Sequence, residues 1–205
     1  MKILVLAANG RTGKLVVEQA KNLGHNVISF IYGTSNLPSE LEGTTIIRGD
    51  ATNAEDIAQA IKNIDVVIST IGHTKNSAPN VQALTMQHLL AAAETYDFKI
   101  VSLTGTGVRV PGDKITIIDR ILNFAVSKID EPRVLDGIKH VELLQQSDHP
   151  WSVVRVLKLT NSRATNSTLS LHGPAKTFVS REEVARALIE VATTNLWDKK
   201  MPIIS

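Results

Sequence analysis

Short apolar runs alternate with amphipathic segments along this chain of 205 residues. The runs are rich in Val and Ile and are apolar on both faces, which is typical of buried parallel strands. Segments with helical spacing fill the intervals, the clearest being the apolar stripe that follows Ser180. The runs that we predict to be strands are Lys2–Leu6, Asn26–Ile31, Thr45–Arg48, Asp65–Ser69, Lys99–Leu103 and Ser152–Val156.

The alternation of strands and helices predicts an α/β fold, a Rossmann-like doubly wound parallel sheet with helices on both faces. The length suits one domain, which we expect to span residues 1–205. Two less regular stretches, at about 105–132 and 157–179, follow the fifth and sixth predicted strands. Because ligands bind at the carboxyl edge of such sheets, we expect these stretches to be the substrate-side segments.

Sequence patterns also predict where several helices begin. Thr52-x-x-Glu55 and Ser180-x-x-Glu183 both have the form of a capping box, in which side chain and backbone amide satisfy each other. An apolar stripe within residues 115–129 predicts a further helix. Its simplest role is packing against the sheet, and the alternative is a small lid formed together with residues 157–176.

The N-terminal strand runs directly into a glycine turn, and a helical segment follows from Lys14 to Leu23. The first amides of a helix lack internal partners and the helix dipole adds positive charge there, so such a turn binds anions. Glycines in the turn let a pyrophosphate and the neighbouring strand approach the backbone. The pattern predicts a dinucleotide pocket, whereas the alternative is an ordinary strand-to-helix turn. The residues predicted to contact the cofactor here are Ala8, Asn9, Gly10, Arg11, Thr12 and Gly13.

The stretch Ala7–Gly13 resembles the GATGxTG turn of the atypical short-chain dehydrogenase/reductases. That group includes NmrA-like proteins, flavin/biliverdin reductase B-like proteins and NADH-flavin reductases. Ala7 departs from the pattern, because the family usually has its first glycine there. The resemblance continues in Lys139–Arg155 and in Phe178–Ala185, which is similar to the family's C-terminal helix start. It implies a Rossmann-like NAD(P)-binding fold over nearly the whole chain.

The resemblance extends the predicted cofactor site along three more strand ends. Asp50 and Ala51 match the family's position beside the adenine, although Asp50 has the alternative role of starting the next helix. The segment Ser69, Thr70, Ile71 and Gly72 is similar to the family segment along the ribose. Beside the nicotinamide, the resemblance implies contacts from Leu103, Thr104 and Val156, the last in place of the family's usual proline.

The sequence contains only a weak signal for the choice between NADP and NAD. An NAD site has an acid about 20 residues past the turn, and an NADP site has a base there, but the second predicted strand ends with neither. Arg11 is a candidate for a 2′-phosphate contact, and Thr34, Ser35 and Asn36 for neutral hydrogen bonds. We favour NADP over NAD because the family that the chain resembles mostly prefers it.

The classical Tyr-x-x-x-Lys pair of this superfamily is missing. Tyr96 and Lys99 have the wrong spacing, and Tyr32 lies near the adenosine end. The resemblance instead implies Thr104 and Lys139 as candidate catalytic residues, with a strand-end hydrogen bond and a solvated helix position as the alternatives. His140 shares the ambiguity of Lys139. His73 is expected to be a solvated loop residue.

Composition excludes several other classes of protein. The chain has no cysteine, so it has neither disulfides nor thiolate chemistry, and we expect a cytoplasmic location. A net charge of +2 with 4% aromatic residues argues against a nucleic-acid partner. No apolar run is long enough for a membrane span. The six histidines lack metal-ligand spacing, so we expect no metal.

These observations favour an NAD(P)H-dependent oxidoreductase that reduces a small conjugated acceptor such as a flavin or a quinone, and acts as a monomer or homodimer. The missing tyrosine fits an enzyme that supplies mainly position and electrostatics. A non-catalytic, NmrA-like dinucleotide sensor is the first alternative. A sugar-nucleotide epimerase or dehydratase is the second, although such enzymes normally keep the Tyr-x-x-x-Lys pair.

Overall fold

The computed structural model describes residues 1–33 and 37–205. The strands are β1 (Lys2–Leu6), β2 (Asn26–Ile31), β3 (Thr45–Arg48), β4 (Val66–Ser69), β5 (Lys99–Gly105), β6 (Trp151–Val156), β7 (Lys158–Thr160), β8 (Leu169–Ser170), β9 (Phe178–Ser180) and β10 (Ile203–Ile204). The helices are α1 (Gly13–Asn22), α2 (Ala54–Ala60), α3 (Val81–Ala93), α4 (Ile117–Ile129), α5 (Glu131–Gln145) and α6 (Arg181–Thr193), with a short 3₁₀ turn at Ser39–Leu41. All six predicted strands are present, with ends that shift by at most two residues.

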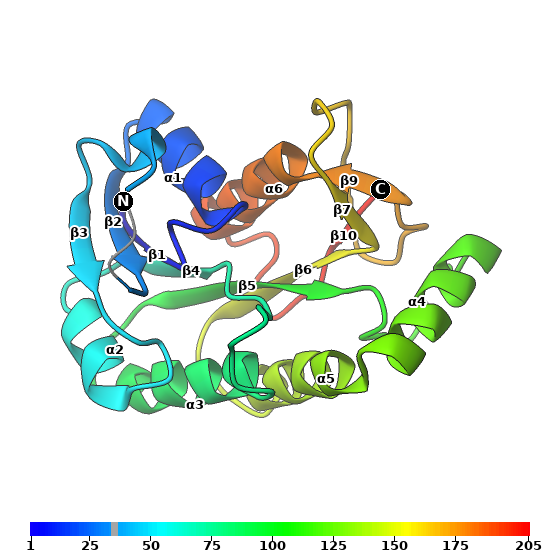
Figure 1. Ribbon diagram of the computed structural model, residues 1–205, viewed down its shortest axis with the longest axis horizontal. Helices are drawn as coiled ribbons and strands as arrows, with labels where there is room; N and C mark the ends of the chain where they lie inside the picture. The colour runs from blue at the N-terminus through cyan, green and yellow to red at the C-terminus, as the bar shows by residue number, and fades with distance from the viewer. Residues whose placement is uncertain (34–36) are drawn as a thin grey trace.

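The main sheet has the order β3-β2-β1-β4-β5-β6-β10-β8. Every pair in it is parallel except that between β10 and β8. Helices α1 and α6 lie on one face, and α2, α3 and α5 cover the other (Figure 1). The predicted doubly wound α/β fold is confirmed. The strand order reverses between β1 and β4, which is where such sheets bind ligands.

Each face of the sheet buries its own apolar cluster. One cluster joins β1 and β4 to α1 and α6 through residues such as Val16, Val17 and Leu188. The other joins the opposite face to α2, α3 and α5 through residues such as Ile57 and Leu89. Because the strands are covered on both faces, their apolar residues run continuously instead of alternating with polar ones.

The predicted capping box at Thr52 is wrong. Helix α2 begins one residue later, and its N-cap is Asn53, whose side-chain oxygen accepts hydrogen bonds from the amides of Glu55 and Asp56. Thr52 is engaged elsewhere, because its amide and its hydroxyl both donate to one oxygen of Asp50, at 2.8 and 2.6 Å. A nearby acid thus outcompetes the helix for the threonine side chain.

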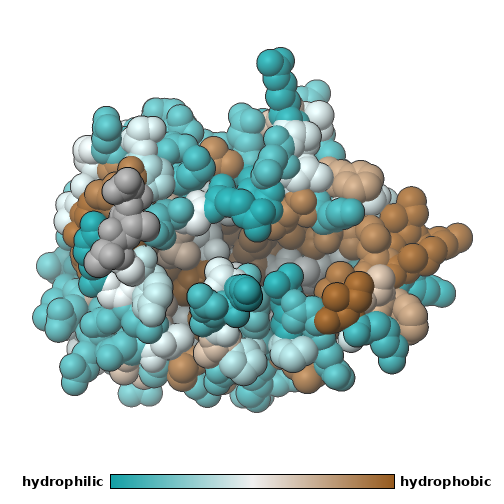
Figure 2. Space-filling view, in the orientation of Figure 1, coloured by the Kyte–Doolittle hydropathy of each residue, from teal (hydrophilic) through white to brown (hydrophobic). Residues whose placement is uncertain are grey.

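The expectation that the apolar stripe of residues 115–129 packs against the sheet is also wrong. Helix α4 extends away from the sheet beyond α5 (Figure 1). Ile117, Phe124 and Ile129 are 78%, 65% and 85% exposed. Apolar side chains gather at that end of the molecule (Figure 2). The amphipathic pattern predicted the helix correctly, but periodicity alone does not say what covers its apolar face.

Arg155 joins segments that are far apart in the sequence. It is fully buried on β6, and its guanidinium forms a bidentate ion pair with Asp113. It also donates to the carbonyl oxygens of Met201, Val108 and Leu171. All five N–H groups of the side chain therefore have a named acceptor, and both irregular segments are anchored to the sheet through one residue.

The capping box at the start of α6 is present as predicted. The Ser180 hydroxyl accepts from the Glu183 amide at 3.1 Å, and the Glu183 carboxylate accepts from the Ser180 amide at 2.8 Å. Lys176 forms an ion pair with the same carboxylate. Burial by itself raises the pKa of Glu183, but the hydrogen bonds from Lys176 and Ser180 outweigh it and lower the pKa to about 2.

A carboxylate whose pKa is lowered by folding stabilises the protein above its unfolded pKa, and the contribution is lost as pH falls through the folded value. We therefore expect Glu183→Gln to lower the free energy of unfolding at pH 7 by roughly 2–3 kcal/mol. The difference from wild type should shrink between about pH 4.5 and pH 2. Urea unfolding across that range measures it, with the exposed Glu190→Gln as control. A difference that does not vary with pH would contradict this account.

Candidate functional site

The glycine turn brings two stretches of backbone into contact. A Cβ at Gly13 would lie 2.2 Å from the Ala7 carbonyl oxygen, which no side chain can tolerate. A Cβ at Gly10 would lie 3.0 Å from the same oxygen, and the Gly10 amide donates to it at 2.9 Å. The Ala7 carbonyl thus holds the start of α1 against the end of β1.

Ala7 adopts the left-handed backbone conformation, with φ of 56°. This conformation costs an L-residue with a Cβ about 1–2 kcal/mol, whereas glycine adopts it freely. The resembling family's preference for glycine at this position has a direct physical explanation here.

Three amides in the turn that leads into α1 have no partner among the described residues, whereas those of Lys14, Leu15 and Val16 donate to carbonyls of the turn. Thr12 is the N-cap but its side chain makes no capping hydrogen bond, and the first turn of the helix contains no acidic residue. Within the part of the chain that the structure describes, the amides of Arg11, Thr12 and Gly13 have no acceptor. Ala8 differs, because it is buried and its amide donates to the Phe30 carbonyl. The predicted contact at Ala8 therefore offers no free donor.

Two arginines flank this turn. Arg11 is exposed, and Arg181 begins α6, which packs beside α1. Burial first, and then the charge of Arg11, lower the pKa of the Arg181 guanidinium. Two cations at the N-termini of adjacent helices favour a bound anion. Arg181 was not among the predicted cofactor contacts, because nothing in the spacing of the sequence places α6 beside the turn.

Asp50 and Ala51 lie just beyond the end of β3. One carboxylate oxygen of Asp50 accepts both hydrogen bonds from Thr52. The other oxygen and the Ala51 amide have no partner among residues 1–33 and 37–205. Asp50 therefore serves the start of α2 and still retains one acceptor, so its two predicted roles are compatible.

The predicted ribose segment lies along the neighbouring strand. Thr70 is anchored to β1, since its hydroxyl donates to the Leu6 carbonyl at 2.8 Å. Ser69 is buried, and a Cβ at Gly72 would meet nothing within 4 Å. Ile71 accepts a hydrogen bond from the Gln82 side chain through its carbonyl. This segment thus forms an ordered wall beside the switch point of the sheet.

Thr104 lies at the next strand end along the same edge. It is buried on β5, and its hydroxyl lies 3.1 Å from the place where a Cβ of Gly137 would be. Leu103 is half-buried, and the Val156 carbonyl accepts from the Thr106 amide at 3.0 Å. The predicted contacts Leu103, Thr104 and Val156 lie at neighbouring strand ends because β5 and β6 pair in parallel, with Leu103 opposite Val154 and Gly105 opposite Val156.

His73 is not the solvated loop residue that the sequence predicted. Its side chain is only 9% exposed, and its Nε2 lies 2.8 Å from a carboxylate oxygen of Asp136. Asp136 is buried on α5, and its oxygens also accept from the amides of Gln82 and Ala83 at 2.9 Å each. No sequence signal indicated this pair, because the partners are 63 residues apart and meet only through the packing of α3 against α5.

Lys139 does not reach the pair formed by His73 and Asp136. It lies on the exposed face of α5 and pairs with Glu142, one turn along the helix. The rotation of the helix instead turns its neighbour His140 inward, where Nε2 lies 2.9 Å from the Ser102 hydroxyl. Burial lowers the pKa of His140 to about 4, against the opposing charge of Asp136. His140 is therefore neutral at pH 7.

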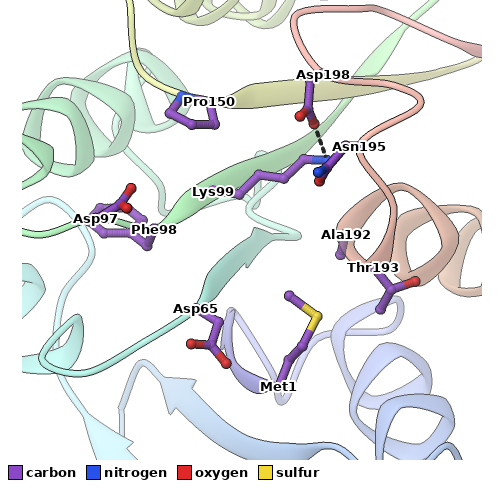
Figure 3. Close-up of a pocket in the computed structure, with 10 residues that line it drawn as sticks. All are labelled: Met1, Asp65, Asp97, Phe98, Lys99, Pro150, Ala192, Thr193, Asn195 and Asp198. Atoms are coloured by element: carbon purple, nitrogen blue, oxygen red, sulfur yellow. Dashed lines mark ion pairs between the residues drawn. The ribbon is translucent and has the colours of Figure 1, made fainter.

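A separate hollow of about 400 Å³ opens at the amino ends of the strands (Figure 3). Lys99 lies in it, but its ammonium donates to the carbonyls of Val191 and Thr194 and pairs with Asp198. All three N–H groups of the lysine are used in holding the end of α6. The hollow therefore lies at the edge opposite the glycine turn and has a structural explanation.

None of the helices among residues 1–33 and 37–205 combines the length and the apolar character that crossing a bilayer requires. No group of three or more His, Cys, Asp or Glu side chains among these residues is arranged to hold a metal ion.

Comparison with known proteins identifies the family. Residues 7–195 match the family model described as NAD(P)H-binding, so the chain belongs to the NAD(P)H-binding family. It is also similar to an isoflavone reductase homologue of Solanum tuberosum, at 35% identity over 81 residues. That match covers 35% of this chain, and the chain spans about a quarter (26%) of the relative's length.

Solved structures share the fold over the whole chain. An anaerobillin reductase from Escherichia coli has a TM-score of 0.80 at 19% identity, with 100% of this chain and 96% of that chain covered. A short-chain dehydrogenase/reductase from Veillonella parvula, solved in complex with NADP, has a TM-score of 0.79 at 16% identity, covering 100% and 94%. The resemblance to short-chain reductases is confirmed, and so is the dinucleotide as the cofactor class.

The turn geometry predicts that a branched side chain at Gly13 abolishes cofactor binding. Gly13→Val would force α1 away from the Ala7 carbonyl and into the phosphate path. Calorimetry should give a micromolar to sub-millimolar Kd for NADPH or NADH with wild type, and binding at least tenfold weaker with the folded variant.

The matched control is Val17→Ala, which removes a buried side chain from the same helix and lowers stability without touching the turn. It should bind like wild type. If wild type binds neither dinucleotide at millimolar concentration, the assignment of the turn is lost.

Proposed function

We propose that this protein is an NAD(P)H-dependent reductase of small conjugated acceptors, such as flavins, quinones or conjugated ketones. The observation that carries the proposal is the uncapped start of α1 at the switch point of the sheet, with Thr104 and His73 on the same edge. When bound, the reduced nicotinamide supplies hydride. The protein's own contribution is to bind the phosphates, to orient the two reactants and to exclude water.

Each candidate residue is assigned to the part of the cofactor that matches its position along the carboxyl edge of the sheet. The amides from Arg11 to Gly13 hold the pyrophosphate, and Asp50 with Ala51 holds the adenine. The segment Ser69–Gly72 lines the ribose. Thr104 orients the nicotinamide or the acceptor carbonyl through its hydroxyl. These roles rest on the donors and acceptors that remain free among the described residues.

Two relatives carry reductase names, which favours a reductase over a non-catalytic sensor. The epimerase alternative loses support, because Tyr96 precedes β5 at the opposite edge and Tyr32 is 71% exposed at the end of β2. A sensor remains the second candidate, since a bound dinucleotide alone does not require turnover.

Turnover separates the two. Purified protein is incubated with NADPH or NADH and a panel of FMN, menadione and benzylideneacetone, and oxidation is followed by absorbance. A reductase oxidises the cofactor only when an acceptor is present. Tight binding of the cofactor without oxidation by any acceptor would instead indicate a sensor.

We further propose NADP as the preferred cofactor, with Arg11 reading the 2′-phosphate. The neutral candidates Thr34, Ser35 and Asn36 lie outside the described residues. A charge-assisted arginine–phosphate contact contributes about 1.5–3 kcal/mol. Arg11→Ala should therefore weaken NADPH by tenfold or more and NADH much less, measured by calorimetry, while the distant Arg120→Ala changes neither. Equal weakening of both cofactors would mean that Arg11 binds the pyrophosphate.

The two irregular segments are also proposed to close over the acceptor. They meet at His172, whose carbonyl accepts from the Lys114 amide at 2.8 Å, and the exposed apolar face of α4 extends from this junction. Hydrogen exchange should slow in residues 117–129 when NADPH and an acceptor are both present, and not with NADPH alone. Helix α2 serves as the unaffected reference. Slowing confined to the glycine turn would leave the lid without support.

A further inference from the structure

The pair formed by His73 and Asp136 is not used by the roles given so far. His73 follows directly after the Ser69–Gly72 segment, at the carboxyl end of β4. Asp136 precedes Gly137, the residue that lies against the Thr104 hydroxyl. The imidazole is thus linked to the proposed nicotinamide end of the site through Asp136 and the adjacent Gly137 of α5.

Asp136 is held by bonds that fix its charge and position. It accepts the amides of Gln82 and Ala83, in the first turn of the 13-residue helix α3, where no side chain of α3 makes a capping bond. A carboxylate at a helix N-terminus is stabilised by the dipole and by charge-assisted hydrogen bonds. The position of the carboxylate is therefore fixed by two backbone amides, and one of its oxygens also lies within hydrogen-bonding distance of His73 Nε2.

The other imidazole nitrogen of His73 faces away from the carboxylate. Nδ1 has no hydrogen-bond partner among the described residues, and it is not among the buried unpaired atoms. Histidine changes charge within a few pH units of neutrality, so a carboxylate-oriented imidazole with one free nitrogen can deliver a proton. The arrangement has the three parts of an acid catalyst: an orienting anion, a proton carrier and an open side.

The groups around His73 do not compete for this role. Helix α5 contributes Asp136 and His140, and His140 is buried and neutral at pH 7. From α3 the facing groups are neutral, namely the two amides and the Gln82 side chain, which donates to the Ile71 carbonyl. Both tyrosines lie elsewhere. Among the groups named here from the described residues, His73 is thus the one suited to donate a proton beside Asp136.

We propose that His73, oriented by Asp136, is the proton donor in the reduction of a conjugated ketone. This inference rests on the proposed reductase function and makes it more specific. A bound reduced nicotinamide would supply hydride to the β-carbon, and the electron pair of the C=C bond would move toward the carbonyl oxygen. His73, protonated at both nitrogens, would give its Nδ1 proton to the resulting enolate and keep its Nε2 hydrogen toward Asp136. Solvent would then return one proton to Nδ1, so the reaction would consume one hydride and one proton for each ketone reduced.

The choice of acceptor distinguishes a proton donor from a residue that only ties the loop. An enolate is strongly basic and needs an acid in the site, whereas a reduced flavin exchanges its protons with water. His73→Gln keeps a side-chain N–H that can donate to Asp136. The hydrogen bond that orders the loop is therefore retained, while the proton donor is lost. His25→Gln is the matched control, because His25 lies outside this corner.

With benzylideneacetone, His73→Gln should lower kcat by about a hundredfold or more, within the range for general acid catalysis. With FMN, kcat should change by less than about threefold. Calorimetry should give the same Kd for NADPH in both proteins, and His25→Gln should match wild type throughout.

Each other result overturns the proposal. An equal loss with both acceptors, at unchanged NADPH affinity, would make His73 a positioning residue. No loss with either acceptor would make the pair a structural tie. A wild type that reduces FMN but not the ketone would reject the ketone as the substrate class. If wild type fails to oxidise NADPH with every acceptor of the panel, the reductase function itself is rejected.

Discussion

The close approach of Gly13 to the carbonyl of Ala7 is the constraint on which the site depends. It lets α1 start directly against the end of β1, so the unpaired amides of Arg11, Thr12 and Gly13 lie beside the edge where the strand order reverses. The cost is visible at Ala7, which bears a Cβ in a left-handed conformation. Strain of this kind persists where the surrounding structure over-determines it, and here the amide of Gly10 fixes the same carbonyl.

Arg155 provides the second constraint, at the other end of the edge. Its buried guanidinium holds Asp113 and the carbonyls near residues 108, 171 and 201 against β6. A buried ion pair of this quality is costly to break, because removing one partner leaves the other charge unpaired.

The strands and the glycine turn could be predicted because each depends on local chemistry: period, β-branching and the absence of a Cβ. What could not be predicted depends on packing between distant segments. Asn53 caps α2 only because Asp50 engages Thr52. His73 is ordered only because α5 brings Asp136 beside the first turn of α3. The hydrophobic periodicity of a sequence contains no information about contacts between segments that lie far apart in the chain.

The central claim is that a dinucleotide binds at the carboxyl edge of the sheet, and amide chemical shifts recorded during an NADPH titration test it most directly. Large, saturating shifts are expected for Gly10, Gly13 and Ala51. Little change is expected around Lys99 and Asn195, which line the hollow at the opposite edge. Saturating shifts confined to that hollow, with the glycine turn unmoved, would contradict the account.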